Sequence, residues 1–134
     1  MQPSVMLQRA ATLMRGGRIA EGEALCRQVL NAAPAQPEAL HLLALAARDR
    51  GNAAEAESLF RKSLAEAPRQ PDLLVNFGNF LRAQRRAAEA EKLLREAVQW
   101  APDFVPGWHS LGLLWLDIGK FSDAGRCAKR VTAL

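Results

Sequence analysis

The sequence predicts an all-α protein, a solenoid of four stacked helical hairpins, and three observations support this fold class. The chain aligns with itself at an offset of 34 residues without gaps, which superposes Pro34, Pro68 and Pro102. Between two prolines, apolar residues such as Leu74 and Leu81 recur at the spacing that lines one face of a helix. Ala and Leu dominate the composition and aromatic residues make up only 6%, which favours helices over strands. One hairpin cannot bury its apolar face alone, so the copies must stack.

The first two copies each predict two helices joined by a short turn that contains glycine. The first copy predicts helices near residues 4–15 and 19–32, and the second predicts them near 37–50 and 53–67. In the second copy Asn52 follows the turn and Glu55 comes three residues later. This is the spacing of a capping box, in which the Asn side chain accepts from a free backbone N–H and the Glu reaches back.

The third copy differs from the others at its turn. Arg85 stands where the other copies have Gly17, Gly51 and Gly119. An arginine there must either adopt a positive φ at some cost or form a different turn.

Two further sets of aligned positions hold small residues, which predicts close approach of the paired helices. These sets are Ala10, Ala44, Gly78 and Gly112 on the first helices, and Gly22, Ala56, Ala90 and Ala124 on the second helices.

These patterns resemble the tetratricopeptide repeat (TPR) family, whose unit is a helix-turn-helix of 34 residues. Trp108, Leu111, Gly112, Trp115 and Ala124 match the family pattern most closely. The resemblance covers residues 1–134 as a single domain, with repeats at approximately 3–36, 37–70, 71–104 and 105–134. It implies a right-handed superhelix that acts as a non-catalytic scaffold for protein–protein interaction.

The last helix presents an apolar side that no later helix of the sequence covers. Its residues are Phe121, Ala124, Ala128, Val131 and Leu134. Tandem repeats normally finish with a capping helix that has a polar outer face. The sequence therefore favours the N-terminal part of a longer protein, and the alternative is weak self-association through this helix.

Charge and cysteine content give further expectations. The formal net charge is +4, and cations collect at the turns inside the hairpins: Arg15, Arg18, Arg48, Arg50, Arg82, Arg85, Arg86 and Lys120. They are interpreted as a solvated edge that complements helix C-termini, with an acidic partner surface as the alternative.

No signal peptide or spanning segment is evident, which predicts a cytoplasmic protein without a membrane partner. Cys26 and Cys127 lie in the first and last copies, too far apart for a disulfide.

The search for catalytic chemistry finds little. Glu38 and His41 have the E-x-x-H spacing of a di-iron half-site, but His109 has Pro106 at the corresponding offset. No H-E-x-x-H motif and no phosphate-binding glycine loop is present. The sequence therefore predicts no catalytic residue, no metal and no cofactor. The sequence argues against nucleic-acid binding, because Trp108 and Trp115 fall on core positions and only Trp100 is expected to be exposed.

The face opposite the core stripe of each first helix is the candidate binding surface. In the TPR family this face lines a concave groove, and here it carries exposed apolar residues between polar ones. The predicted peptide-binding residues are His41, Leu42, Leu45, Arg48, Val75, Asn76, Asn79, Arg82, His109 and Leu113. Asparagines suit a peptide backbone and arginines suit a carboxylate, so the expected partner is a peptide or helix with apolar anchors and an acidic group.

Two alternatives to this interpretation remain. Neighbouring helices could cover some of the apolar side chains in the groove. The resemblance also extends to segments that precede glycosyltransferase or sulfotransferase domains, where the chain would serve as a recognition or dimerisation arm.

Overall fold

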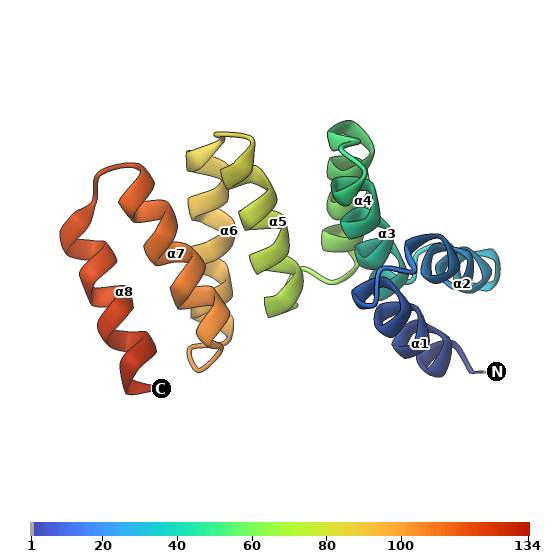
Figure 1. The fold of residues 1–134 in the computed structure, drawn as a ribbon. Coiled ribbons are helices and arrows are strands. Elements are labelled where there is room, and N and C mark those ends of the chain that lie inside the picture. Colours follow the sequence, from blue (N-terminus) through green and yellow to red (C-terminus); the bar gives the residue numbers. More distant parts are fainter. Residues whose placement is uncertain (1) are drawn as a thin grey trace. The chain divides into compact units, whose positions relative to one another are not determined.

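The computed structural model describes residues 2–134, in which eight helices and no strand are present. The helices are α1 Pro3–Arg15, α2 Ile19–Ala32, α3 Pro37–Asp49, α4 Ala53–Glu66, α5 Pro71–Ala83, α6 Ala87–Trp100, α7 Val105–Asp117 and α8 Phe121–Ala133. Consecutive helices pair as four hairpins (Figure 1). The predicted all-α fold is confirmed, and the helix bounds agree with the sequence-based ones to within one residue.

Contacts divide the chain into two compact units. Unit 1 ends at Pro68 and holds α1–α4, and unit 2 runs from Arg69 to Leu134 and holds α5–α8. In unit 1, α3 packs against α1, α2 and α4. In unit 2, α7 packs against α5, α6 and α8. Each unit is therefore a stack of two hairpins in which the first helix of the second hairpin contacts the three other helices.

Prolines and polar side chains begin the helices. Proline occupies one of the first two positions of α1, α3, α5 and α7, where its missing N–H removes no helical hydrogen bond. At the start of α4 the backbone N–H of Glu55 donates to Asn52 Oδ1 at 3.3 Å, as predicted. The Glu55 carboxylate accepts from the side-chain amide of Asn52 at 2.9 Å, whereas the backbone N–H of Asn52 donates to Ala47. The expected capping box is thus only half formed.

The turn after α5 keeps the geometry of the glycine turns although it contains arginine. Arg85 has φ 60°, close to the 79° of Gly51 at the same place in unit 1. Its N–H donates to Arg82 O at 3.0 Å, and the N–H of Arg86 donates to Leu81 O at 2.9 Å, which is the Schellman pattern of a helix C-terminus. Arg85 is the only non-glycine residue with positive φ among residues 2–134. The first of the two predicted alternatives, a positive φ, is the one adopted.

Small residues lie where paired helices approach most closely, as predicted. A Cβ atom added to Gly78 of α5 would lie 2.8 Å from Cγ and Cδ2 of Leu94 on α6. One added to Gly112 of α7 would lie 3.1 Å from Cβ of Cys127 on α8. These contacts are closer than ordinary van der Waals separation, so a larger residue at either position would require its neighbour to move.

Both cysteines are free and buried, at 0% exposure for Cys26 and 2% for Cys127. Burial raises the pKa of the Cys26 thiol from 9.0 to about 11, and the nearby carboxylates of Glu23 and Glu38 add to the effect. Burial, with Asp123, also raises the pKa of Cys127. Both thiols are packing residues rather than nucleophiles.

We expect Cys26 to be alkylated slowly in the folded protein. A pKa raised by about two units lowers the thiolate fraction about a hundredfold at pH 8, and only the thiolate reacts. Iodoacetamide labelling followed by mass spectrometry should therefore be at least about a hundredfold slower in buffer than in denaturant. Equal rates in the two conditions would contradict the burial of this side chain.

Candidate functional site

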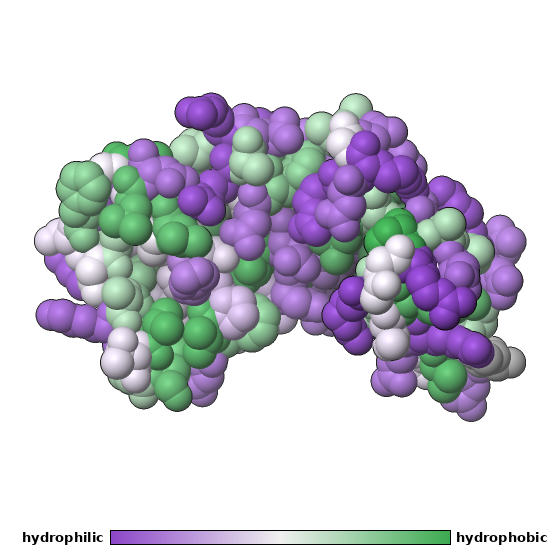
Figure 2. Space-filling model, viewed as in Figure 1, coloured by the Kyte–Doolittle hydropathy of each residue, from purple (hydrophilic) through white to green (hydrophobic). Residues whose placement is uncertain are grey.

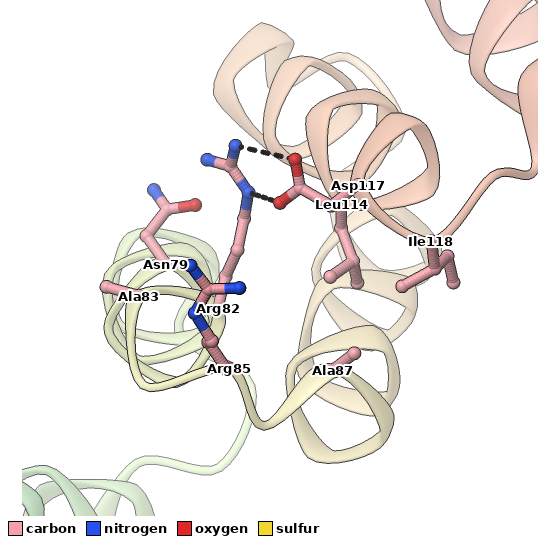
Figure 3. Close-up of a pocket in the computed structure, with 8 residues that line it drawn as sticks. All are labelled: Asn79, Arg82, Ala83, Arg85, Ala87, Leu114, Asp117 and Ile118. Atoms are coloured by element: carbon pink, nitrogen blue, oxygen red, sulfur yellow. Dashed lines mark hydrogen bonds and ion pairs between the residues drawn. The ribbon is translucent and has the colours of Figure 1, made fainter.

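One face of unit 2 carries an open pocket of about 580 Å³, which we name the α5–α7 pocket (Figure 3). Its lining residues are Asn79, Arg82, Ala83, Arg85, Ala87, Leu114, Asp117 and Ile118. The lining includes two guanidinium groups, one carboxylate and the amide of Asn79, and small or aliphatic side chains form the rest of the wall. The pocket therefore combines a net positive charge with apolar surface.

Helical spacing brings these side chains together. Asn79, Arg82 and Ala83 follow the i, i+3, i+4 pattern on α5, so they share one edge of that helix. Leu114 and Asp117 lie on the corresponding edge of α7. Because α5 and α7 pack against each other, the two edges face one another across the pocket.

An ion pair closes one side of the pocket. Arg82 Nε donates to Asp117 Oδ2 at 2.5 Å, and Arg82 Nη2 donates to Asp117 Oδ1 at 3.3 Å (Figure 3). The hydrogen bond from Arg82 lowers the pKa of Asp117, and the positive charge of Arg85 lowers it further. Asp117 is therefore ionised at neutral pH, and it occupies part of the hydrogen-bonding capacity of Arg82.

Arg85 is the cation of this pocket that no carboxylate neutralises directly. Within residues 2–134 its side chain makes no hydrogen bond and no ion pair, and it lines the same pocket as Asn79 and Arg82 (Figure 3). The side chain of Asn79 likewise makes no hydrogen bond to the described part of the chain. The pocket thus presents a guanidinium and an amide that no group of residues 2–134 uses.

Most of the cations at the hairpin turns are neutralised inside the chain, which supports the interpretation of a solvated edge. Among the described residues, six of the eight form ion pairs. The pairs are Arg18–Glu21, Arg48–Asp49, Arg50–Glu23, Arg82–Asp117, Arg86–Glu89 and Lys120–Glu91. Arg15 donates to the Thr12 hydroxyl, so Arg85 stands apart from the rest.

The structure distributes the predicted site residues of unit 2 over several places. Asn79 and Arg82 line the α5–α7 pocket. Val75 is buried at 4% exposure, so its side chain belongs to the core. Asn76 is half-buried on α5. His109 and Leu113 line a second hollow between α7 and α8.

The four predicted residues of unit 1 also differ in exposure. His41 is buried at 8% exposure with its ring 6.1 Å from that of Phe60, and Leu42 packs against the core of the unit. Leu45 is half-buried, and Arg48 is exposed and paired with Asp49 at 2.9 Å. His41 therefore belongs to the core, Leu42 and Leu45 each keep part of their side chains exposed, and Arg48 is already paired with a carboxylate.

Sequence reasoning missed Leu114, Asp117 and Ile118 as members of a binding surface. Arg85 was named among the turn cations, for which an acidic partner surface was the alternative interpretation, and its place in the glycine series predicted backbone strain. No signal pointed to the partners on α7, since the offset from Arg82 to Asp117 is 35 residues and falls between aligned positions.

Two absences apply to the part of the chain that the structure describes. Within residues 2–134, no three side chains of the metal-binding types His, Cys, Asp and Glu cluster together. Over the same residues, no helix is both long enough and apolar enough to cross a membrane.

Hairpins of constant length, close glycine contacts and repeated Schellman turns define an α-helical repeat protein. The sequence profile of the tetratricopeptide repeat matches residues 47–132, and a second profile with the same description matches residues 7–71. The chain therefore belongs to the tetratricopeptide repeat family, which consists generally of non-catalytic scaffolds for protein interaction. No curated protein sequence matches it.

Several solved structures share the fold. Pseudomonas aeruginosa PilF is 26% identical in sequence to this chain, and the two structures superpose with a TM-score of 0.90. The match covers 96% of this chain and 59% of the PilF chain. A Thermobaculum terrenum O-GlcNAc transferase mutant is 30% identical in sequence to this chain, with a TM-score of 0.79. The match covers 84% of this chain and 22% of the transferase chain. PilW, a type IV pilus biogenesis factor, is 23% identical with a TM-score of 0.87, covering 98% and 61%, and shows the fold alone. The chain thus spans 59% and 22% of the first two proteins.

Proposed function

We propose that this chain is a non-catalytic scaffold whose α5–α7 pocket holds the acidic group of a partner peptide or helix. The observation that carries the proposal is Arg85, which stays in a left-handed conformation although glycine would adopt it without strain. Backbone strain of this kind is found mostly at functional sites. The side chain it brings into the pocket has no acidic partner within the described residues.

The chemistry of the pocket fits a carboxylate. A guanidinium can grip both oxygens of a carboxylate at once, and charge-assisted hydrogen bonds are roughly twice as strong as neutral ones. Arg85 offers this grip, and Arg82 retains N–H donors that Asp117 does not use. Asn79 supplies one donor and one acceptor, which suits a peptide backbone beside the carboxylate.

The apolar part of the pocket sets the neighbouring residue of the partner. Ile118 is 39% exposed, and Ala83, which lines the same pocket, is also exposed. An aliphatic side chain next to the acidic group would cover this surface and remove it from water. The proposed ligand therefore pairs an Asp or Glu with a nearby Leu, Ile or Met.

A second candidate function rests on the likeness to the O-GlcNAc transferase structure, which covers 84% of this chain at 30% identity. The chain would then be the recognition or dimerisation arm of a larger transferase, as the sequence also allowed. The same pocket would bind the acidic segment of a protein substrate. Sequence from the complete gene distinguishes the two, because only the second requires a transferase domain.

Selection from a random peptide library tests the proposal, and it should recover peptides that contain an acidic residue close to an aliphatic one. We expect Asp117→Asn to bind a recovered peptide about tenfold more tightly, equivalent to about 1.4 kcal/mol. The reason is that the substitution removes a repelling charge and releases Arg82.

Asp123→Asn is the matched control, because it removes the same charge from an exposed ion pair with Arg126 outside the pocket. Fluorescence anisotropy measures both affinities. Selected peptides without acidic residues, or an equal gain in both variants, would contradict the proposed site.

A further inference from the structure

The charge balance of the α5–α7 pocket limits the negative charge that a ligand can bring into it. Arg82 and Arg85 contribute two positive charges and Asp117 contributes one negative charge, so the lining carries a net charge of +1. Figure 2 shows hydrophilic side chains around the turn between α5 and α6, with hydrophobic surface beside them over α7. Because the pocket is open, a ligand enters it from water and loses part of its hydration there.

Asp117 is a fixed negative charge in the same pocket as Arg85. Arg82 donates to both of its carboxylate oxygens, at 2.5 Å and 3.3 Å. The hydrogen bond from Arg82 lowers the pKa of Asp117, and so does the positive charge of Arg85. The charges of Arg85 and Asp117 therefore act on each other, and an anion bound by Arg85 is repelled by Asp117.

Contacts on both sides of Asp117 hold the end of α7 in place. Glu91 of α6 accepts from Trp115 Nε1 at 3.3 Å and from Lys120 Nζ at 3.4 Å. Trp115 and Lys120 flank Asp117 and Ile118 in the sequence. The carboxylate of Asp117 thus stays in the pocket when a ligand approaches.

The repeat does not require an aspartate at the position of Asp117. The aligned residues of the other first helices are Arg15, Asp49 and Ala83. In the ion pair of unit 2, the side chains of Arg82 and Asp117 remain 31% and 47% exposed. Ion pairs with this exposure contribute little to the free energy of unfolding. The charge of Asp117 therefore acts mainly on what enters the pocket.

Ligands with one and with two negative charges respond differently to this charge. The attraction to a positive site grows in proportion to the charge of the ligand, whereas the cost of removing an ion from water grows with the square of its charge. A side-chain carboxylate carries a single negative charge, which balances the pocket. A phosphoserine carries a charge of about −1.5 to −2 at neutral pH, so it would leave excess negative charge beside Asp117.

We propose that Asp117 makes the α5–α7 pocket selective for singly charged carboxylates over phosphorylated residues, which rests on the proposed binding of an acidic peptide there. Asp117 cancels one of the two arginine charges and occupies two of the N–H donors of Arg82. A phosphate group has three acceptor oxygens and needs these donors. The pocket recognises a partner through Asp or Glu and not through phosphorylation.

Peptides that differ in a single residue test this selectivity. A peptide recovered by the library selection is synthesised with glutamate, O-sulfoserine or phosphoserine in place of its acidic residue. The sulfate and phosphate groups have the same shape, but the sulfate carries only one negative charge. Fluorescence anisotropy at neutral pH should show that the wild type binds the sulfoserine peptide about tenfold more tightly than the phosphoserine peptide.

Asp117→Asn should abolish this preference. Because the repulsion is proportional to the charge of the ligand, a gain of about tenfold for the sulfoserine peptide becomes about a hundredfold for the phosphoserine peptide. Urea denaturation should be nearly unchanged, since the lost ion pair is partly exposed. Asp123→Asn removes the same charge outside the pocket and should leave all three affinities as they are in the wild type.

The outcomes separate this selectivity from the binding on which it rests. Equal gains for the sulfoserine and phosphoserine peptides in Asp117→Asn would overturn the role of Asp117. Tighter binding of the phosphoserine peptide by the wild type would overturn it as well, while the binding of carboxylates would stand. If Arg85→Gly binds the glutamate peptide as tightly as the wild type does, the proposed function itself fails, and the selectivity fails with it.

Discussion

Leu94→Ala is expected to destabilise unit 2 by about 2–5 kcal/mol, the range for removing a large aliphatic side chain from a packed core. Leu94 is 0% exposed on α6, and its Cγ and Cδ2 atoms lie against the backbone of Gly78 on α5. Truncation would leave a cavity at the point where the two helices approach most closely. All three tryptophans lie in unit 2, so their fluorescence during urea denaturation reports this loss directly.

The opposing glycine provides a matched test of the same contact. Gly78→Ala alone should destabilise unit 2 by about 1–3 kcal/mol, because its methyl group would overlap the Leu94 side chain. In the double variant this methyl group enters the space that Leu94 has left. The combined loss should therefore be smaller than the sum of the two single losses. Additive losses would show that the two helices are not in direct contact at this position.

Much of the fold could be predicted because the same residue requirements recur in each of the four repeats. Proline at helix starts, glycine at the turns and small residues at close contacts recur at a fixed offset, so each copy checks the others. Arg85 shows how far this reasoning reaches. Its position in the glycine series predicted either a strained backbone or a new turn, and the structure has the strained backbone with φ 60°.

The candidate site was less predictable, because it depends on side chains from helices that are not adjacent in the sequence. The aligned positions compare residues 34 apart, whereas the ion pair joins Arg82 and Asp117 at an offset of 35. Two packed helices meet along edges that are rotated and shifted relative to the repeat. The repeat therefore predicts which helices meet but not which side chains pair.

Burial explains why some predicted groove residues lie in the core instead. The repeat pattern predicts one core stripe on each first helix, but α3 packs against three helices of unit 1. A helix enclosed in this way buries a wider arc than the stripe of a surface helix. His41 lies within that wider arc, and Val75 is buried on α5 in the same column of the repeat. His109 has no following helix beside it among the described residues and stays exposed.

Arg85→Gly tests the central claim most directly, because the claim predicts opposite effects on stability and on binding. Relief of the left-handed strain contributes about 1–2 kcal/mol of stability, and the greater freedom of glycine in the unfolded chain offsets about 0.4–1 kcal/mol of it. The free energy of unfolding in urea denaturation should therefore rise by up to about 1.6 kcal/mol. The affinity for an acidic peptide should fall about 10- to 100-fold, as expected for the loss of a charge-assisted hydrogen bond.

Arg126→Gln serves as the control for charge, since it removes one cation at an exposed position of α8 outside the pocket. The measurement is the peptide dissociation constant and the free energy of unfolding of the same Arg85→Gly sample. A more stable protein with much weaker peptide binding, while the control binds normally, is the predicted result. A more stable protein that binds the acidic peptide as tightly as the wild type would contradict the account.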